Sequence, residues 1–459
     1  MMAKKLISKP RDFPSVEELL QSTQLASAVV SLPRPLAAAL VKSCVARLKL
    51  SLMDDGDSLE VSELYSTLRD ELIGAATRSI SRVINATGVV VHTNLGRAPL
   101  SETLFDEVKR TVVGYGNVEY DIGSGARGRR GEACEDYLAL LSGAETGTVV
   151  NNCAAALFII LNTLANRKKV LISRGELIQI GGGFRIPDIL KKSGAKLCEI
   201  GTTNITTLAD YENNIDSRTA LILKVHRSNF TQSGFTEDVT LKQLVELGEK
   251  HNLPVINDLG SGVFIPTSKI FGYREPTVQE SVRAGASLTC FSGDKMLGGM
   301  QAGLIVGRSN LVTKIKKNPI FRTIRVDKVV FAVLERLLTI YLNGTHLDDI
   351  KLWRLLSTNR AHLRSVAEKI LKQLGKPDGI TVENTDAFVG GGALPEQPIK
   401  SVGLVFSARY SARKLMKTFR EFRPPVIGRV DDDRFILDLK AVDESDYTNI
   451  VKAVRRVIK

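Results

Sequence analysis

The sequence is poor in cysteine and has no long hydrophobic run. Its five cysteines are scattered over 459 residues without a CxxC pair, which argues against a disulfide framework or a zinc knuckle and favours a reducing cytoplasm. No stretch of about eighteen consecutive apolar residues occurs, so no membrane-spanning helix is expected. The basic N-terminal segment has no sustained apolar stretch behind it, so a signal peptide is not expected either. We therefore predict a cytoplasmic protein that has no membrane partner.

Several motifs that assign a reaction directly are also absent. The sequence has no GxxxxGK[ST], HExxH or GxSxG, and its dispersed histidines and cysteines predict no metal centre. One GxGxxG match, GSGARG at residues 123–128, is followed by arginines where a helix should begin to pack on a sheet. No ribose-binding acid clearly ends a second strand, so we interpret GSGARG as a flexible basic loop rather than a dinucleotide site.

The charge balance is basic. The 63 lysines and arginines against 50 aspartates and glutamates give a formal net charge of +13. Such an excess favours a polyanionic partner, either nucleic acid or a phosphorylated ligand, although from charge alone a basic solvated surface is the simpler explanation. With 43% hydrophobic and 25% charged residues the composition is that of a globular protein, and the length suggests two or three domains.

Three regions of different character follow one another. Residues 1–80 carry helical patterns broken by prolines and by a turn-like MDDGDS (residues 53–58), which predicts a separate helical domain. In residues 81–326 short β-branched runs alternate with helical patterns, which predicts an α/β domain with a mainly parallel, helix-covered sheet. Residues 327–459 have helical patterns followed by strand-like runs, which predicts an α+β C-terminal domain. Ligands of parallel sheets bind at the carboxyl ends of the strands.

The segment VVNNCAAAL predicts a strand that leads directly into a helix. The backbone amides near Asn152, Cys153 and Ala154 would then lie at a helix N-terminus, where unpaired N–H groups and the helix dipole favour phosphate. Taken alone, the segment is better explained by an asparagine that caps the helix.

Two further strand ends carry polar side chains. VINDLGSG ends an apolar strand with Asp258, which could hold a protonated heterocyclic nitrogen or close an ordinary turn before glycine. KVHRSNF places His226, Ser228 and Asn229 at another strand end, where they could bind or stack on a cofactor ring or simply close a turn.

A fourth strand end leads to a single lysine. Lys295 lies in the glycine-rich bend of FSGDKMLGGMQAGLIVG, and partial burial is what a lysine needs to bond covalently to an aldehyde. Ser292 could add a hydroxyl to the phosphate site. The order of phosphate site, acid and lysine on successive strand ends is that of pyridoxal 5'-phosphate (PLP) enzymes with the aminotransferase-like fold. Each feature is weak alone, but their order and spacing strengthen the joint interpretation.

Three arginines are candidates for binding an anion. Arg97 lies in a predicted loop, and Arg322 and Arg325 follow a run of lysines. Guanidinium groups suit oxyanions such as phosphate, whereas the lysines are explained by a solvated helix face.

Longer segments resemble one family closely. The resemblance runs from about Arg82 to Lys328 and returns near the C-terminus. Its segments are RVINATGVVVHTNLGRAPLS, SRGELIQIGGGFRIPD, EIGTTN, KVHRSNF, DLGSG, FSGDKMLGGMQAGLIVG and PPVIGRVDDDRFILDL. They are similar to those of bacterial selenocysteine synthases, the L-seryl-tRNA(Sec) selenium transferases. The resemblance implies a large domain of PLP fold type I with a seven-stranded type of sheet, and the helical N-terminal segment fits the full-length bacterial form.

The resemblance also implies a reaction. Lys295 would hold PLP, Asp258 would keep the pyridine nitrogen protonated, and Asp294 would be an acid or base. L-seryl-tRNA(Sec) would become L-selenocysteinyl-tRNA(Sec) through an aminoacrylyl-tRNA intermediate that takes selenium from selenophosphate. The three arginines would bind the selenophosphate oxyanion.

The partners implied by the resemblance are seryl-tRNA(Sec), selenophosphate and further copies of the chain, arranged as dimers in a homodecameric ring; no DNA is expected. The N-terminal domain would recognise the tRNA, although residues 1–80 contain ten basic and ten acidic residues. Two positions depart from the family pattern: Met300 replaces a usual proline, and Cys153 replaces a usual asparagine.

Two other functions remain open from the sequence. One is a related PLP lyase or ammonia-lyase that acts on a small phosphorylated amino acid and needs no tRNA domain. The other is a non-catalytic RNA-binding protein on a decayed PLP scaffold, against which the intact Lys295, Asp258 and Arg97 count.

Overall fold

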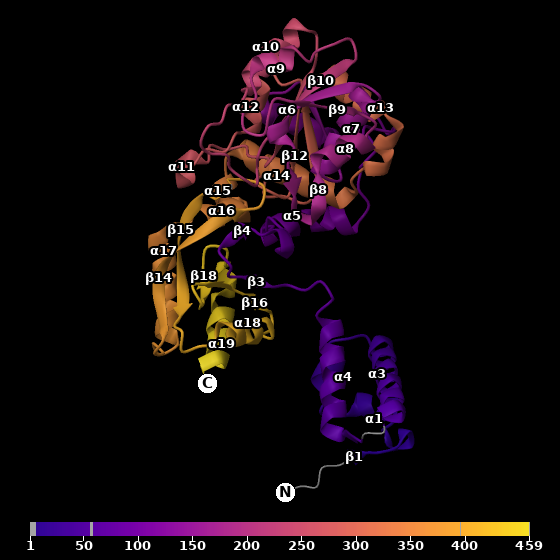
Figure 1. Ribbon diagram of the computed structural model, residues 1–459, viewed down its shortest axis with the longest axis vertical. Coiled ribbons are helices and arrows are strands. Elements are labelled where there is room, and N and C mark those ends of the chain that lie inside the picture. The colour runs from indigo at the N-terminus through magenta and orange to yellow at the C-terminus, as the bar shows by residue number, and fades with distance from the viewer. Residues whose placement is uncertain (1–5, 56–57, 395, 459) are drawn as a thin grey trace. The chain divides into compact units, whose positions relative to one another are not determined.

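The computed structural model describes residues 6–55, 58–394 and 396–458, and the chain divides into two compact units, residues 1–82 and residues 83–459 (Figure 1). Within the described residues, every helix is too short or too polar to cross a lipid bilayer.

The first unit is a small helical bundle. Its elements are β1 (Leu6–Ile7), α1 (Val16–Gln21), α2 (Ala26–Val29), α3 (Arg34–Asp55), β2 (Leu59–Glu60) and α4 (Val61–Ala76). One face of α4 carries leucines four residues apart, Leu64, Leu68 and Leu72, which are buried against α3 because this spacing aligns them on one side of a helix. Residues 53–55 of the expected turn belong to the end of α3, and residues 56–57 lie outside the described residues.

The second unit is built on a seven-stranded sheet. Its strands are β5 (Thr146–Val150), β6 (Lys169–Ser173), β9 (Lys196–Ile200), β10 (Thr219–Val225), β11 (Val255–Gly260), β12 (Leu288–Ser292) and β13 (Gly303–Gly307). They lie in the order β5-β13-β12-β11-β10-β6-β9, and β13 runs antiparallel to both of its neighbours. Strands alternate with helices along the chain upstream of Lys295, and six of the seven strands run in the same direction, as the sequence predicted.

Helices cover both faces of this sheet or pack beside it. They are α5 (Glu102–Val113), α6 (Glu132–Ser142), α7 (Cys153–Ala165), α8 (Ile186–Lys192), α9 (Leu208–Glu212), α10 (Leu241–Lys250), α11 (Ser268–Phe271), α12 (Val278–Arg283), α13 (Ser309–Lys317), α14 (Lys328–Asn343), α15 (His346–Asp349) and α16 (Lys351–Ser357). Successive strand residues point to opposite faces. Cys290 of β12 packs in the cluster with α7, α8 and α13, and the next residue, Phe291, packs in the cluster with α5, α6 and α14. The strands are therefore buried on both sides, as expected for a parallel sheet.

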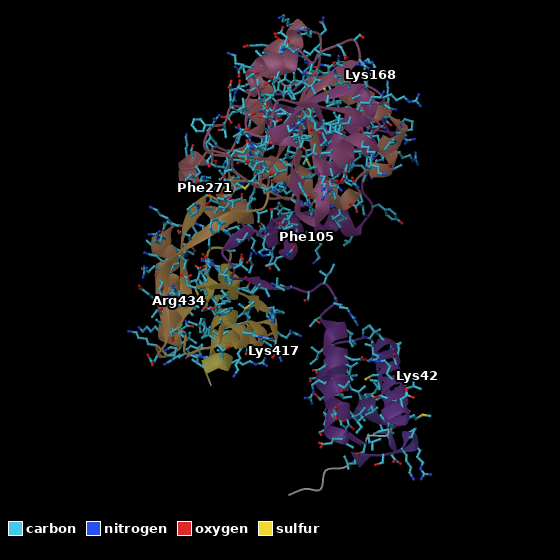
Figure 2. All side chains as sticks on the ribbon, in the orientation of Figure 1. Lys42, Phe105, Lys168, Phe271, Lys417 and Arg434 are labelled. Atoms are coloured by element: carbon cyan, nitrogen blue, oxygen red, sulfur yellow. The ribbon has the colours of Figure 1, made fainter. Side chains whose placement is uncertain are left out.

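A smaller α+β part completes the second unit. It contains β14 (Ile380–Gly390), β15 (Pro398–Phe406), β16 (Val426–Ile427), β17 (Arg429–Asp431), β18 (Arg434–Asp438), α17 (Arg360–Gln373), α18 (Ala412–Arg420) and α19 (Tyr447–Ile458). Its sheet has the order β17-β18-β15-β14-β4, so it incorporates β4 (Val89–Val91) from well upstream, and β3 (Ile84–Asn85) pairs with β16. Charged side chains such as Lys168 and Lys417 lie on the outside of the unit, away from these cores (Figure 2).

Candidate active site

Polar side chains from four strand ends meet in one cavity of about 230 Å³. The lining residues that the sequence had singled out are Arg97, Asn152, Cys153, Ala154, His226, Ser228, Asp258, Ser292, Asp294 and Lys295. Arg97 comes from the loop after β4. The others follow or end β5, β12, β11 and β10, which occupy adjacent places in the sheet apart from the intervening β13. Because these four strands are parallel, their carboxyl ends lie at one edge, and this edge forms the cavity.

The N-terminus of α7 faces this cavity. Asn152 is the cap of α7, and its side-chain oxygen accepts a hydrogen bond of 2.9 Å from the amide of Ala155. The helix offers no acceptor to the earlier amides of Cys153 and Ala154, and both residues line the cavity. Asn152 can therefore cap the helix while the helix N-terminus binds an anion, because the cap uses the amide of Ala155 and the anion would use those of Cys153 and Ala154. Ser292 lines the same cavity and is almost fully buried.

Asp258 is a buried carboxyl group at the end of β11. Burial raises its pKa above the ordinary value, and the nearby charge of Lys295 and a thiol hydrogen bond oppose that rise. The thiol of Cys153 donates to Asp258 Oδ1 at 3.6 Å. A carboxylate in this position favours a cationic partner, such as a protonated heterocyclic nitrogen, because neutralisation offsets the cost of its burial.

Lys295 is only 6% exposed and lies in a closely packed bend after β12. The bend is fixed by hydrogen bonds of Gly293 N to Ala302 O (2.9 Å) and Gly299 N to Gly293 O (2.8 Å). Met300, which departs from the family pattern, packs partly buried against the neighbouring core.

A loop of the α+β part encloses the Lys295 side chain. Gly392 follows β14 with φ +102°, and a Cβ atom there would lie 2.5 Å from Lys295 Nζ and 2.6 Å from its Cε. The loop is anchored by hydrogen bonds from Leu394 N to Glu275 Oε2 (3.2 Å) and from Thr231 Oγ1 to Glu396 Oε2 (2.9 Å). Sequence analysis missed Gly392, because nothing local connects a glycine run near residue 390 with a lysine almost a hundred residues earlier.

Asp294 and Arg97 form an ion pair at the rim of the cavity. Arg97 Nη1 donates to both carboxylate oxygens, at 3.0 Å to Oδ1 and 2.9 Å to Oδ2. A backbone hydrogen bond from Ala98 N to Asp294 O (3.1 Å) joins the two segments. Among the described residues, Arg97 Nε and Nη2 have no hydrogen-bond partner, so the same guanidinium can still bind another anion.

His226 is held by a buried carboxyl group. Its Nε2 lies 3.0 Å from Glu275 Oε1, although the two atoms are not well aligned for a hydrogen bond. Glu275 is 3% exposed and also accepts from the loop that encloses Lys295. It therefore positions both the imidazole and the loop, and no sequence pattern predicted this role for Glu275. Ser228 lies beside His226 and lines the cavity.

Three residues that the sequence singled out do not line this cavity. Asn229 turns its amide to the carbonyl of Gln179 at 2.8 Å and so holds β7 (Gln179–Ile180) in place. Arg322 is exposed, and Arg325 lies 3.7 Å from Glu119 beside a different cavity. Within one chain, therefore, only Arg97 of the three arginines reaches the Lys295 cavity.

One wall of the cavity comes from a segment that sequence reasoning did not place. Ile178, Ile180 and Gly181 line it. The segment is held by the buried carboxylate of Glu176, which accepts hydrogen bonds from Lys224 Nζ (2.7 Å) and from Val225 N (2.9 Å). Gln301 also lines the cavity. The triple glycine after Ile180 was the only local signal of a loop here.

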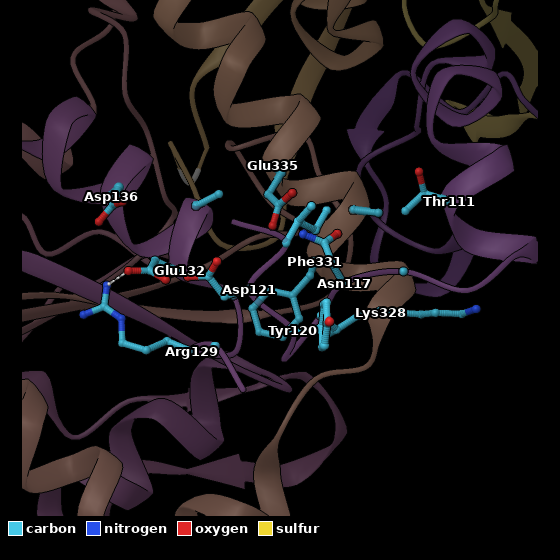
Figure 3. Close-up of a pocket in the computed structure, with 17 residues that line it drawn as sticks. Thr111, Asn117, Tyr120, Asp121, Arg129, Glu132, Asp136, Lys328, Phe331 and Glu335 are labelled. Atoms are coloured by element: carbon cyan, nitrogen blue, oxygen red, sulfur yellow. Dashed lines mark ion pairs between the residues drawn. The ribbon is translucent and has the colours of Figure 1, made fainter. Parts of the chain in front are cut away.

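A second cavity, of about 410 Å³, lies between α14 and the segment that connects α5 to α6 (Figure 3). Acidic side chains outnumber basic ones in its lining, and Glu132 pairs with Arg129 at 2.7 Å. GSGARG at residues 123–128 forms a mostly exposed loop here, not the end of a strand of the main sheet. An acidic lining repels phosphate, so this larger cavity is not the candidate site for an anionic cofactor.

The Lys295 cavity fits PLP on its own chemistry. The free amides of α7 with Ser292 suit the phosphate group, Asp258 suits the ring nitrogen, and the amine of Lys295 suits the aldehyde. His226 lines the same cavity as these phosphate-, nitrogen- and aldehyde-binding groups.

Comparison with known proteins identifies the family of the chain. The model of the SelA family, described as L-seryl-tRNA selenium transferase, matches residues 83–443. Proteins named L-seryl-tRNA(Sec) selenium transferase include that of Alkaliphilus metalliredigens, 39% identical over 97% of this chain and 98% of its own length. That of Geotalea daltonii is 40% identical over 98% and 99%, and that of Aquifex aeolicus 45% identical over 83% and 85%.

A solved structure supports the fold. D-glucosaminate-6-phosphate ammonia-lyase superposes with a TM-score of 0.61 at 19% identity, covering 83% of this chain and 97% of that chain. With the sheet order, this likeness confirms the predicted α/β fold class, PLP fold type I. At the level of sequence, the family match and the full-length relatives agree, and the chain belongs to the SelA family of L-seryl-tRNA selenium transferases.

Proposed function

We propose that this protein is a PLP-dependent transferase of selenocysteine biosynthesis, which converts L-seryl-tRNA(Sec) to L-selenocysteinyl-tRNA(Sec). One observation carries the proposal: a buried lysine, a buried aspartate and a free helix N-terminus share one cavity, in a chain about 40% identical along its length to enzymes named for this reaction. Selenophosphate is the proposed selenium donor.

The cofactor is pyridoxal 5'-phosphate. When bound, it supplies an electron sink that makes the seryl Cα proton acidic and the β-hydroxyl group able to leave. Lys295 would hold the cofactor and would also move the proton at the seryl Cα. Asp258 would hold the ring nitrogen in its protonated form. The amides of Cys153 and Ala154, with Ser292, would hold the phosphate, and His226 and Ser228 would border the ring. Asn229 acts indirectly, because it anchors β7, whose Ile180 lines the cavity.

In this proposal, Asp294 and Arg97 act on the substrates from the rim of the Lys295 cavity. Asp294 is the acid or base that acts at the seryl side chain, and its ion pair with Arg97 fixes its orientation. Arg97 binds the selenophosphate oxyanion with its remaining guanidinium nitrogens. Arg322 and Arg325 do not line this cavity within one chain, so their role in the same clamp requires that a second subunit bring them to it.

The remaining proposals concern partners and location. The helical unit of residues 1–82 recognises seryl-tRNA(Sec), by shape rather than by overall charge. The enzyme works in the cytoplasm as a homo-oligomer, with dimers assembled into a decameric ring. The formal net charge of +13 suits a polyanionic RNA substrate.

The deciding experiment supplies the purified protein with seryl-tRNA(Sec), selenophosphate and PLP, and measures selenocysteinyl-tRNA after hydrolysis. Formation of selenocysteine that depends on both substrates is expected. A free phosphorylated amino acid, without tRNA, is the parallel substrate. Turnover of that compound, combined with no reaction of seryl-tRNA(Sec), would refute the proposal and favour an ammonia-lyase.

Replacing Gly392 with alanine should lower kcat by about 10²-fold, because the new methyl group displaces the Lys295 side chain by a distance that matters for reaction geometry. Gly344→Ala is the matched control. Gly344 also has a positive φ, +76°, but a Cβ atom there meets nothing within 4 Å. Both variants carry the backbone cost of about 1–3 kcal/mol, so their melting temperatures should fall alike. Equal activity of the two variants would contradict the contact with Lys295.

Arg97→Lys should raise the KM for selenophosphate about tenfold while changing the KM for seryl-tRNA(Sec) little. A lysine can pair with Asp294 but has no second arm for the oxyanion, and a charge-assisted hydrogen bond contributes about 1.5–3 kcal/mol. The control is Arg218→Lys, since Arg218 pairs with Asp216 at 3.1 Å before the opposite, amino end of β10. Steady-state kinetics with each substrate varied in turn measures the effect. An equal rise in both KM values would argue against an oxyanion role.

A further inference from the structure

Two thiols flank the carboxyl group of Asp258, and the proposed reaction uses neither of them. Cys153 begins α7, and Cys290 lies on β12, where it is paired in register with Asp258 of β11. One ligand atom from each of the three residues lies within 4.8 Å of the other two. We propose that Cys153, Asp258 and Cys290 form a binding site for a thiophilic divalent cation such as Zn²⁺, and that this cation and the cofactor exclude one another.

The distances match zinc coordination. Zinc–sulfur bonds are about 2.3 Å and zinc–oxygen bonds about 2.1 Å, so a tetrahedral angle places the sulfur and the oxygen about 3.6 Å apart. Cys153 Sγ and Asp258 Oδ1 are 3.6 Å apart. Two sulfurs on one zinc lie about 3.8 Å apart by the same geometry, which is within the 4.8 Å limit of the cluster. Little movement is therefore needed to place a cation between the three atoms.

The donor set selects the class of metal. Two thiolates and one carboxylate favour Zn²⁺, Co²⁺ or Cd²⁺ over Mg²⁺ and Ca²⁺, which prefer oxygen ligands. With the thiols deprotonated the three ligands carry three negative charges. A divalent cation and the nearby Lys295 ammonium group supply three positive charges, so the occupied site is neutral. Three protein ligands leave a fourth position for water or an added thiol.

The cavity supplies the route of entry and the reason for exclusion. Cys153 and Asp258 both line it, whereas Cys290 is fully buried behind them. A cation that reaches Asp258 through the cavity occupies the carboxylate that would hold the cofactor's ring nitrogen; this exclusion rests on the proposed function. The alternative is that the thiols only fill space and donate to Asp258, as the thiol of Cys153 does here.

Co²⁺ titration of the full-length protein, stripped of PLP and kept reduced without oxygen, tests the site. We expect one Co²⁺ per chain and a thiolate-to-cobalt charge-transfer band in the near ultraviolet, which Zn²⁺ then removes. The melting temperature should rise with Zn²⁺. Cys153→Ser and Cys290→Ser should each weaken Zn²⁺ binding at least about tenfold. Cys198→Ser is the matched control, because Cys198 is a partly exposed thiol on β9 outside the cluster.

Each other outcome overturns the proposal. The absence of a charge-transfer band would refute the metal site, and so would a band that survives Cys153→Ser. A Cys153–Cys290 disulfide that forms in air would also refute it, if the reduced protein binds no Co²⁺. A band that persists at full strength after saturation with PLP overturns the exclusion. Selenium transfer is not measured in this titration, so a protein that binds Co²⁺ but makes no selenocysteinyl-tRNA refutes the proposed function and leaves the metal site standing.

Discussion

Lys295→Ala should reduce the formation of selenocysteinyl-tRNA by at least about 10³-fold. Lys295 is the one residue in the proposal that both bonds to the cofactor and moves a proton at the substrate, and proton transfer alone contributes about 10²–10⁴-fold. No other lysine lines the cavity among the described residues. The side chain is buried between Gly392 and Gly260, so its loss leaves a gap that no neighbouring amine can fill.

Two measurements separate this effect from general damage. Borohydride treatment of the PLP-loaded protein should attach the cofactor to Lys295, and mass spectrometry of the digest locates it. Lys242→Ala is the control, because Lys242 is a highly exposed lysine on α10. It should retain both the labelling of Lys295 and full activity. Turnover by Lys295→Ala at the rate of the Lys242 variant would eliminate the proposed mechanism.

The sequence predicted the part of the site that lies directly at strand ends. Each strand leads into its polar residue within a few positions, so a local pattern suffices to place Asp258, His226 and Lys295 at the same edge. Burial on both faces makes these strands continuous apolar runs, which are easy to identify. The signal for the proposed phosphate site was equally local, because one strand–helix junction forms it.

What the sequence did not predict depends on contacts between distant segments. Gly392 encloses Lys295 from a loop of the α+β part, and Glu275 joins that loop to His226. The ion pair of Arg97 with Asp294 spans nearly two hundred residues, and both residues were identified without any sign that they touch. Neither periodicity nor turn composition carries information about such pairs.

The sequence also placed three residues in the site that a single chain does not bring there. Asn229 lies one position beyond Ser228, and its amide bonds to the backbone of β7 instead of facing the cavity. Arg322 and Arg325 were singled out by their chemistry, and the resemblance assigned them a role in binding selenophosphate, but neither indicates which subunit supplies them. A homo-oligomer can reconcile this implied role with the position of the two arginines, since a residue far from the cavity of its own chain can face the cavity of a neighbouring subunit.

Asp258→Asn should lower kcat by about 10²–10³-fold and, in the same protein without PLP, raise thermal stability. The loss of activity follows because asparagine cannot hold a proton on the ring nitrogen, and removal of one preorganised electrostatic group costs about this factor. The gain in stability follows because the carboxyl group is buried at a cost that Lys295 and the Cys153 thiol offset only in part. Sites built for function are commonly destabilising in this way.

The gain in thermal stability of Asp258→Asn should depend on pH in a defined direction. Burial raises the pKa of Asp258, so the folded protein holds this proton more tightly than the unfolded chain does. Stability therefore falls as the pH rises from about 4 through the raised pKa, and Asp258→Asn removes that fall. The melting-temperature advantage of the PLP-free variant should be larger at pH 8 than at pH 5.

Asp210→Asn supplies a control of opposite sign. Hydrogen bonds from Thr207 lower the pKa of Asp210, so this carboxylate stabilises the folded protein above its ordinary pKa and the stabilisation is lost as the pH falls. The Asp210 variant should melt below the unmodified protein at pH 8 and approach it at acid pH, with activity unchanged. If Asp258→Asn instead melted lower at pH 8, the partners of the carboxylate within the protein would outweigh the cost of its burial. Its burial would then be no reason to expect a cationic ring beside it.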